Sequence, residues 1–241
     1  MSTGLGNATG AVAGADALFE VMRTTRSMRR LRHDRVPDEV LTRLIEAASW
    51  GPSARNQQGC EYIVVTDRAQ IARLAPLWRL AVELYDATAL PRLDDAVGPR
   101  SAAAIRALAA DLEQVPAVIA ICHPISAVPE EYQRGAFRRT VAALGLRRTM
   151  RLLRSMRELA LLRDAASAFP AMQNLLLAAR ALGLGASTFM LHQLVDHDVA
   201  EVLAVPPGVR VMALVSVGWP MGHFGPVHRH STADIIHRDV W

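Results

Sequence analysis

Lysine is absent from this sequence of 241 residues, so all 27 strongly basic side chains are arginines. With 23 acidic residues the formal net charge is +4, and the pI is about 9.8. One interpretation is the codon bias of a GC-rich genome; the other is a need for rigid guanidinium groups that bind phosphate or carboxylate. Both stay open at this point. Aromatic residues make up 5%, too few for platforms on which bases stack, so we expect no nucleic-acid partner.

Cysteines and long apolar runs are scarce as well. Cys60 and Cys122 match no metal-ligand spacing and are too few for a disulfide scaffold, which is typical of a reducing compartment. No apolar run reaches the roughly 18 residues of a membrane span, so we expect no membrane partner. Residues 1–16 lack the basic start and leucine-rich stretch of a signal peptide. We expect them to form a flexible tail on a cytoplasmic protein.

Patterns of side-chain catalysis and metal binding are missing too. We find no nucleophile triad and no carboxylate pair. The histidines lack the HExxH spacing or a comparable one, so we expect no metal; those considered are His192, His197, His228, His230 and His237. These patterns therefore give no indication of side-chain catalysis or of a metal site.

Hydrophobic periodicity predicts a helix-rich single domain over residues 17–241. Apolar runs bounded by turn residues predict strands at 62–65, 115–122 and 209–217. Helical spacing predicts helices at 17–24, 37–51, 68–84, 96–112, 138–162 and 165–182, followed by an irregular tail after residue 219. Such a mixture indicates an α+β fold, with a mixed sheet on which helices pack.

Two polar segments are candidates for binding. Closely spaced guanidinium and hydroxyl groups at Thr25–Arg30, including Arg26, Ser27 and Arg29, suit a phosphate. The alternative is an ordinary solvated basic surface. At 51–58 the chain turns and presents amide groups that can read the edge of a flat heterocycle, unless this is an ordinary polar loop.

Taken in order, these segments resemble the start of the FMN-dependent nitroreductase family. The matching stretches are RSMRRL, then RVPDEVLTRLIEAASWGPSARNQQ, and the strand EYIVVTD. A second region, ASAFPAMQNLLLAARALGLGAS, resembles the family's long core helix and Gly-Leu-Gly turn. A third, VSVGWPMGHFGPVHRHSTADIIHRDVW, resembles the last strand, the basic stretch and the terminal segment of one large subgroup. Thr25 stands where many members have a further arginine, and Gly59-Cys60 replaces their Pro-Trp.

The resemblance implies a fold and a cofactor. The fold is a central mixed or antiparallel sheet flanked by helices, with a C-terminal extension exchanged between the subunits of a homodimer. The cofactor is FMN, with Arg26, Ser27, Arg29 and Arg229 on its phosphate. Ser53, Asn56 and Gln58 would contact the ribityl chain and ring edge, and the backbone at Met190 and Leu191 would lie beside the ring; Pro52, Ala54 and His228 complete the expected set.

The resemblance also implies an oxidoreductase in which the flavin carries the chemistry and no side chain is catalytic. NAD(P)H would be the co-substrate and a nitroaromatic, a quinone or a related small molecule the acceptor, in a ping-pong cycle. One alternative is an FMN-dependent dehydrogenase of a small metabolite. Another is a protein that stores or sequesters FMN without turnover.

Residues 125–163 match nothing in the family and lie where its members vary their substrate lid. Arginines at 147, 148, 151 and 154 recur at helical spacing, with an apolar side opposite them. This pattern is typical of an amphipathic helix with a solvated basic face. The hypothesis is that the segment caps the flavin pocket and that its arginines select an anionic substrate or the NADPH phosphate; binding to a membrane surface is favoured least.

Overall fold

The computed structural model describes residues 14–88, 92–125 and 130–241, without the side chains of 130–136, 152–161 and 163. Most of the expected N-terminal tail lies outside these residues, and α1 (Ala15–Thr24) begins just after it. In the described chain, the other α-helices are α2 (Asp38–Ser49), α3 (Arg68–Thr88), α4 (Leu93–Val97), α5 (Pro99–Ala110), α6 (Glu130–Leu144), α7 (Leu146–Ala181), α8 (Asp196–Val202) and α9 (Thr232–Ile235). None of them is long and apolar enough to cross a membrane.

The sheet is antiparallel throughout, which confirms the α+β class and the antiparallel form of the expected sheet. Its strands are β1 (Glu61–Val65), β2 (Ala117–Pro124), β3 (Gly185–Phe189) and β4 (Val209–Gly218), in the order β1-β2-β4-β3. β3 was not predicted from the sequence, because its five residues GASTF are mostly small and follow directly on a glycine turn. Its pairing with β4, from Gly185 opposite Gly218 to Phe189 opposite Leu214, makes it a strand.

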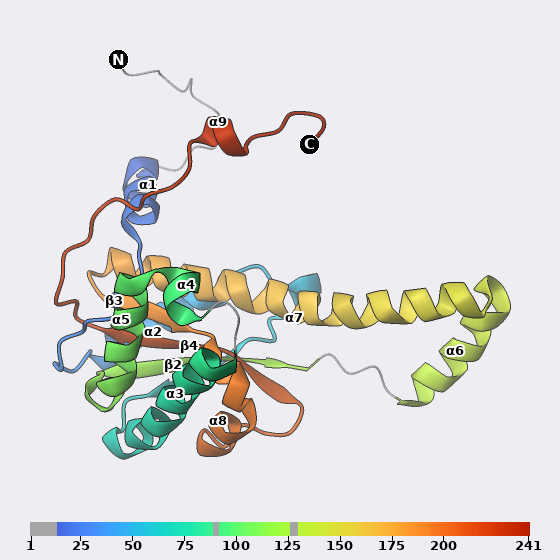
Figure 1. Cartoon of the computed structure of the whole chain (residues 1–241), viewed down its shortest axis with the longest axis horizontal. Coiled ribbons are helices and arrows are strands. Elements are labelled where there is room, and N and C mark those ends of the chain that lie inside the picture. Colours follow the sequence, from blue (N-terminus) through green and yellow to red (C-terminus); the bar gives the residue numbers. More distant parts are fainter. Residues whose placement is uncertain (1–13, 89–91, 126–129) are drawn as a thin grey trace.

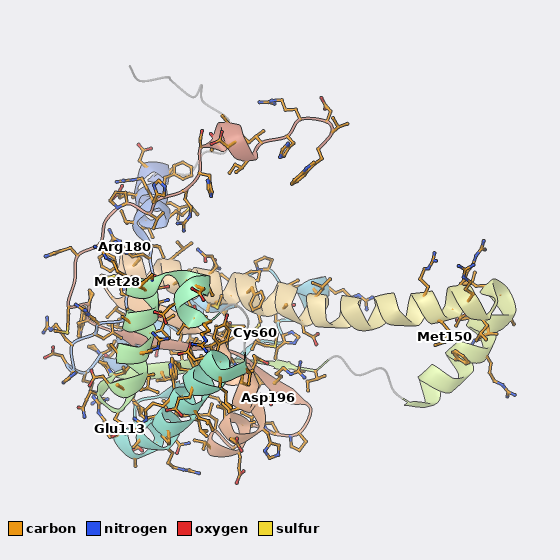
Figure 2. The ribbon with its side chains drawn as sticks, in the orientation of Figure 1. Met28, Cys60, Glu113, Met150, Arg180 and Asp196 are labelled. Atoms are coloured by element: carbon orange, nitrogen blue, oxygen red, sulfur yellow. The ribbon has the colours of Figure 1, made fainter. Side chains whose placement is uncertain are left out.

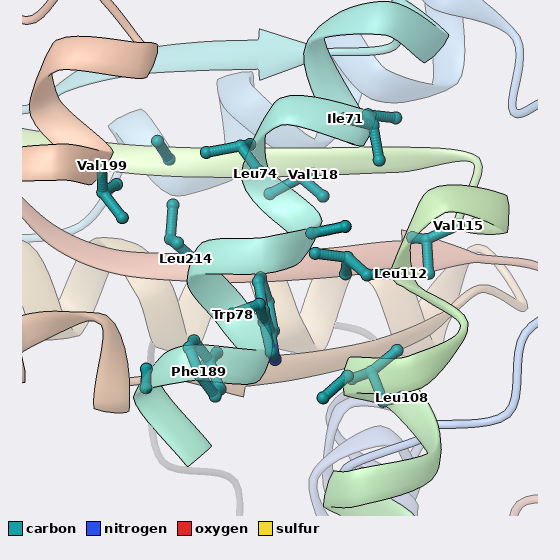
Figure 3. Close-up of a cluster of buried hydrophobic side chains, with 14 of the residues drawn as sticks. Ile71, Leu74, Trp78, Leu108, Leu112, Val115, Val118, Phe189, Val199 and Leu214 are labelled. Atoms are coloured by element: carbon teal, nitrogen blue, oxygen red, sulfur yellow. The ribbon is translucent and has the colours of Figure 1, made fainter. Parts of the chain in front are cut away.

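Two apolar layers enclose this sheet (Figure 1). On one face α3, α5 and α8 cover a core in which Trp78 stacks on Phe189 with ring centroids 3.9 Å apart. Figure 3 shows how Ile71, Leu74 and Trp78 of α3 lie along the sheet. On the other face α2 and α7 bury their own apolar rows against the sheet; these include Leu41, Leu44, Leu175, Ile119 and Val215. The sheet is therefore buried on both faces, as its nearly continuous apolar strands require.

Helix boundaries differ from the sequence prediction at two places. The helix predicted at 96–112 is two helices, α4 and α5, because Pro99 starts a new helix at its first position. The break predicted between the helices at 138–162 and 165–182 is wrong. The helix α7 runs continuously through 163–165, because no glycine or proline interrupts it there. Residues 138–144 belong instead to α6, which ends at Gly145 with φ 76°.

The helix α6 and the first half of α7, residues 130–162, form a helical hairpin that we call the arm. It projects from the body of the molecule, as Figure 1 shows, so that Met150 in Figure 2 lies far from the sheet. Leu144, Leu146 and Met150 near its turn are 45–60% exposed. These three apolar side chains are therefore not covered by the rest of the described chain.

A close contact between α2 and α7 fixes the start of the 52–58 loop. A Cβ on Gly51 would lie 2.8 Å from the backbone nitrogen and 2.9 Å from the Cα of Ala171. No side-chain rotation relieves such a contact, because both atoms belong to the backbone of a packed helix. Glycine is therefore required at this position.

We predict that Gly51→Ala destabilises the protein by about 1–3 kcal/mol, because the added methyl group forces α2 and α7 apart. Urea unfolding measures the loss. Gly222→Ala is the matched control, since a Cβ there meets only the end of Met28 at 3.5 Å. Equal midpoints for the two variants would contradict the close-contact argument.

Candidate functional site

The edge strand β3 pairs with the segment that follows α1. Met28 N donates to Ala186 O at 2.9 Å, and Ser27 forms an isolated parallel bridge with Ala186. A Cβ on Gly185 would meet Met28 and Leu31 at 2.9 Å, so this segment lies directly on the strand. The pairing places Arg26, Ser27 and Arg29 beside β3.

The C-terminal segment runs along the same stretch of chain. Arg32 N donates to Trp219 O at 2.7 Å, and Met221 N donates to the carbonyl of Arg30 at 3.0 Å. Further on, Val227 N donates to Arg23 O at 3.0 Å. These backbone bonds bring residues 228 and 229 next to residues 26–29, although they lie at opposite ends of the sequence.

Three adjoining hollows surround this junction. The phosphate residues expected from the sequence share the first one; it is lined by Arg26, Ser27, Arg29, Pro226, Val227, His228 and Arg229. The second is bounded by Arg26, Ser27 and Arg229 together with side chains of α7. The third extends from Arg29 over residues 187–191 of β3 to Trp78 and Tyr85, so it includes the expected Met190 and Leu191.

We call Arg26, Arg29 and Arg229 the arginine cluster. Within the described residues none of the three forms an ion pair; Arg229 Nη1 donates only to the carbonyl of His228, at 2.7 Å. Burial lowers the pKa of Arg29, because a guanidinium loses hydration there. Three cations held side by side without an acid form a site for an anion.

The 52–58 loop is held in a strained shape. Arg55, Asn56 and Gln58 all have positive φ, between 50° and 56°, a region that residues other than glycine rarely adopt. Ser53 Oγ accepts from Gln58 N at 3.0 Å, and Ala54 N donates to Ser167 Oγ of α7 at 3.2 Å. The side chains of Pro52, Asn56 and Gln58 stay exposed.

Within one chain this loop does not meet the arginine cluster. The loop is attached to α7 at Ser167, whereas the second hollow reaches α7 between Gln173 and Arg180. Measured from Ser167 along the helix axis, Gln173 lies about 9 Å away and Arg180 about 20 Å away. None of residues 52–58 lines any of the three hollows. Figure 2 shows Arg180 and Cys60, which follows the loop, at separate places in the molecule. The structure therefore brings together the expected residues at 26–29, 190–191 and 228–229, and sets those at 52–58 apart.

Sequence reasoning missed several residues of the second hollow, among them Gln173 and Arg180 of α7 and Phe224 of the C-terminal segment. A signal was present, because Gln173, Leu176 and Arg180 follow i, i+3, i+7 spacing on one face of an otherwise apolar helix. Two polar residues on such a face indicate that this side of the helix borders a polar site and not the apolar core.

The two departures from the family pattern have local explanations. Thr25, where many members have arginine, uses its hydroxyl to cap α1, donating to Val21 O at 2.6 Å. Cys60 Sγ donates to Ser167 O at 3.6 Å, and burial raises the pKa of this thiol, which keeps it protonated. Cys60 therefore packs between the loop and α7.

The histidines divide into a buried and an exposed group. His192 is 1% exposed, with Nδ1 3.0 Å from Phe189 O and Nε2 3.0 Å from Val211 O. Burial lowers the pKa of His192, which favours the neutral ring, and the contacts with two backbone carbonyls hold this ring inside the core. His197 lies with Asp198 and Glu201 on α8, in an exposed cluster of a kind common without any metal.

Comparison with known proteins relates this architecture to others. An NADH dehydrogenase of Thermus thermophilus is 29% identical over 214 residues, which are 85% of this chain and 87% of the relative. A nitroreductase of Desulfovibrio desulfuricans in complex with FMN superposes with a TM-score of 0.57 at 21% identity, over 93% of this chain and 97% of that one. An iodotyrosine deiodinase bound to FMN and 3-iodo-L-tyrosine superposes with a TM-score of 0.68 at 17% identity, over 93% and 100% of the two chains.

The sequence model of the nitroreductase family matches residues 22–219. This range extends from the end of α1 to Trp219, directly after β4, and so includes the whole sheet and both cores. The chain belongs to the nitroreductase family.

Proposed function

We propose that the protein is an FMN-dependent oxidoreductase that takes electrons from NAD(P)H and passes them to a small organic acceptor. The observation that carries the proposal is the arginine cluster, in which Arg26, Arg29 and Arg229 face adjoining hollows with no acidic partner among the described residues. The names of the Thermus relative and the FMN-bound neighbours support the same class of enzyme.

The donor set fits the cofactor. A phosphate monoester with nearly two negative charges suits guanidinium and hydroxyl donors, here Arg26, Ser27 and Arg229. Arg29 lies between the first hollow and the third, whose floor is formed by Trp78 and residues 187–191. This floor is apolar enough to exclude water from one side of a flat ring. When bound, FMN supplies two-electron redox chemistry; the chain binds and orients it.

NAD(P)H and the acceptor would use the same open face in turn, in a ping-pong cycle. Nitroaromatics and quinones are the acceptor classes that we propose, because both are flat and can lie over an apolar surface. No acid or base of this chain is needed for such a cycle. The side chains that matter are those that place the cofactor.

We further propose that one FMN is bound by two copies of the chain. The 52–58 loop, whose exposed amide groups are expected at the ribityl chain and ring edge, lines none of the three hollows around its own arginine cluster. A second copy can supply the loop. One chain also leaves apolar side chains uncovered after α2 and near its ends: Phe19, Trp50, Ile235, Ile236 and Trp241 are 55–100% exposed.

The arm fits this arrangement as a lid on the partner's site. It projects from its own body, so it does not reach its own arginine cluster (Figure 1). Arg147, Arg148 and Arg151 on the arm are exposed, as the amphipathic pattern predicted, whereas the side chain of Arg154 lies outside the described residues. In a dimer these cations would meet an anionic substrate or the phosphate of NADPH.

Purified protein is expected to be yellow, with one FMN per subunit. Arg26→Ala or Arg229→Ala should weaken FMN binding by about 1.5–3 kcal/mol, because each removes charged hydrogen bonds to the phosphate. Fluorescence titration of the apoprotein measures this. Arg43→Ala, an exposed arginine of α2, is the control. Full flavin retention in both cluster variants contradicts the phosphate site.

Turnover is tested by mixing the holoprotein with NADPH or NADH without oxygen. Rapid loss of the flavin absorbance, followed by its return when a quinone or nitroaromatic is added, is the expected result. A flavin that stays bound and oxidised would instead support storage of FMN.

Light scattering should show a homodimer at micromolar concentration. We expect its interface to bury about 2,000–5,000 Å², the size typical of obligate dimers.

A complementation test locates the two half-sites. Arg26→Ala/Arg229→Ala chains and Asn56→Ala/Gln58→Ala chains should each bind FMN weakly, but heterodimers of the two should recover one intact site. No recovery, or a monomer that retains FMN, contradicts the shared site.

Replacing Arg147 and Arg151 by Gln should raise the KM for NADPH and leave FMN content unchanged, because the arm would lose charge that faces the substrate and none that faces the cofactor. Steady-state kinetics with a neutral quinone is the control, and its KM should stay the same. Unchanged KM for NADPH and for anionic acceptors would leave the arm a solvated basic helix.

A further inference from the structure

Arg180, in the last turn of α7, faces the second hollow together with Arg26 and Arg229. A basic residue at a helix C-terminus is commonly explained by the helix dipole alone. Here two specific contacts hold the side chain in place, so the dipole is not a sufficient explanation. Figure 2 shows Arg180 at the end of the molecule where α1 and Met28 lie.

The first contact is with Thr24. Arg180 Nε donates to Thr24 Oγ1 at 2.9 Å, and the same hydroxyl donates to Glu20 O at 2.7 Å. Thr24 is only 4% exposed. Since its proton is committed to a backbone carbonyl, the hydroxyl has a lone pair fixed in direction, which orients the guanidinium.

The second contact is with Phe224. The guanidinium carbon of Arg180 lies 4.2 Å from the centroid of the Phe224 ring, a cation–π arrangement. Phe224 belongs to the C-terminal segment that also carries Arg229. The ring therefore covers one side of the guanidinium, in the hollow that both residues line.

These contacts use one of the five N–H donors of Arg180 and leave the four on Nη1 and Nη2 available. No ion pair with an acidic side chain is formed by Arg180 within the described chain. Two N–H groups on a planar fork match two oxygens of a phosphate. The guanidinium of Arg180 therefore adds to the electrostatic repulsion between Arg26 and Arg229, and an anion bound among the three would relieve it.

We infer that Arg180 is a further phosphate-binding residue of the flavin site and that Thr24 and Phe224 are its positioning residues. This inference rests on the proposed function. Thr25 holds the place where many relatives have an arginine, and its hydroxyl is used within α1. Arg180 supplies a guanidinium to the same hollow from a different element.

The test compares FMN with riboflavin, which has the same ring and ribityl chain but no phosphate. With the apoprotein, Arg180→Gln should raise the Kd for FMN roughly ten- to hundredfold, as loss of a charged hydrogen-bonding pair does. The Kd for riboflavin should stay within about twofold, because only the phosphate contact is removed. Arg180→Lys should recover part of the FMN affinity, and Arg43→Gln should change neither Kd.

Positioning by Thr24 and Phe224 is tested in the same titrations. Thr24→Val and Phe224→Leu keep the cation but remove its acceptor or its ring, so each should weaken FMN less than Arg180→Gln does and leave riboflavin unaffected. Thermal unfolding shows whether Arg180→Gln folds. If it does not fold, the variants Thr24→Val, Phe224→Leu and Arg180→Lys replace it as the test, and unchanged FMN binding in all three overturns the inference.

The outcomes separate this inference from the proposed function. If Arg229→Gln weakens FMN and Arg180→Gln does not, Arg180 is no phosphate ligand while the flavin site stands. If Arg180→Gln weakens FMN and riboflavin equally, Arg180 only joins α1 to α7, and the inference is wrong. If the wild-type apoprotein binds neither flavin, the proposed function itself fails.

Discussion

The site depends on backbone hydrogen bonds that tie three distant segments together. Met28 N bonds to β3, and residues 23–32 bond to residues 219–227 of the C-terminal segment. Arginines on these segments repel one another, so side-chain attraction cannot assemble the arginine cluster. Backbone pairing and the close packing of Gly185 on Met28 and Leu31 hold it instead. A bound dianion would relieve the repulsion that folding builds up, and this is the physical basis of the phosphate site proposed above.

The distribution of ion pairs explains part of the all-arginine composition. Away from the site, arginines meet acids: Arg106 lies 2.7 Å from Asp86 and 2.6 Å from Asp94, and Arg35 lies 2.9 Å from Asp38. Exposed pairs of this kind contribute little to stability, and lysine would serve them about as well. Near β3 the guanidinium groups face hollows without acids in the described chain. The proposed anion site accounts for the second group, whereas nothing in the structure requires arginine in place of lysine in the first.

The helix α7 acts as a rigid spacer. Its C-terminal half buries Leu175 and Ala179 against the sheet, while its polar face reaches Ser167 near the loop and Arg180 near the arginine cluster. A straight helix cannot bring these two positions together, so its length sets the geometry of the proposed dimer. The close contact at Gly51 and the positive φ angles of Arg55, Asn56 and Gln58 then fix how the loop leaves α7. A rigid helix and a rigid loop suit the proposed site, which a second chain would complete.

The sequence by itself determined most of the elements and the expected site residues, because local spacing, glycine and proline act over a few residues. Three strands, the arginine segment at 26–29 and the polar loop at 52–58 follow from such short-range patterns. Only the tertiary structure decided that residues 185–189 form a strand, that α7 is continuous and that the loop lies apart from the arginines. It also brought Arg180 into the same hollow as Arg26 and Arg229. These features depend on which distant segments share backbone hydrogen bonds and close packing, and no local pattern of residues contains that information.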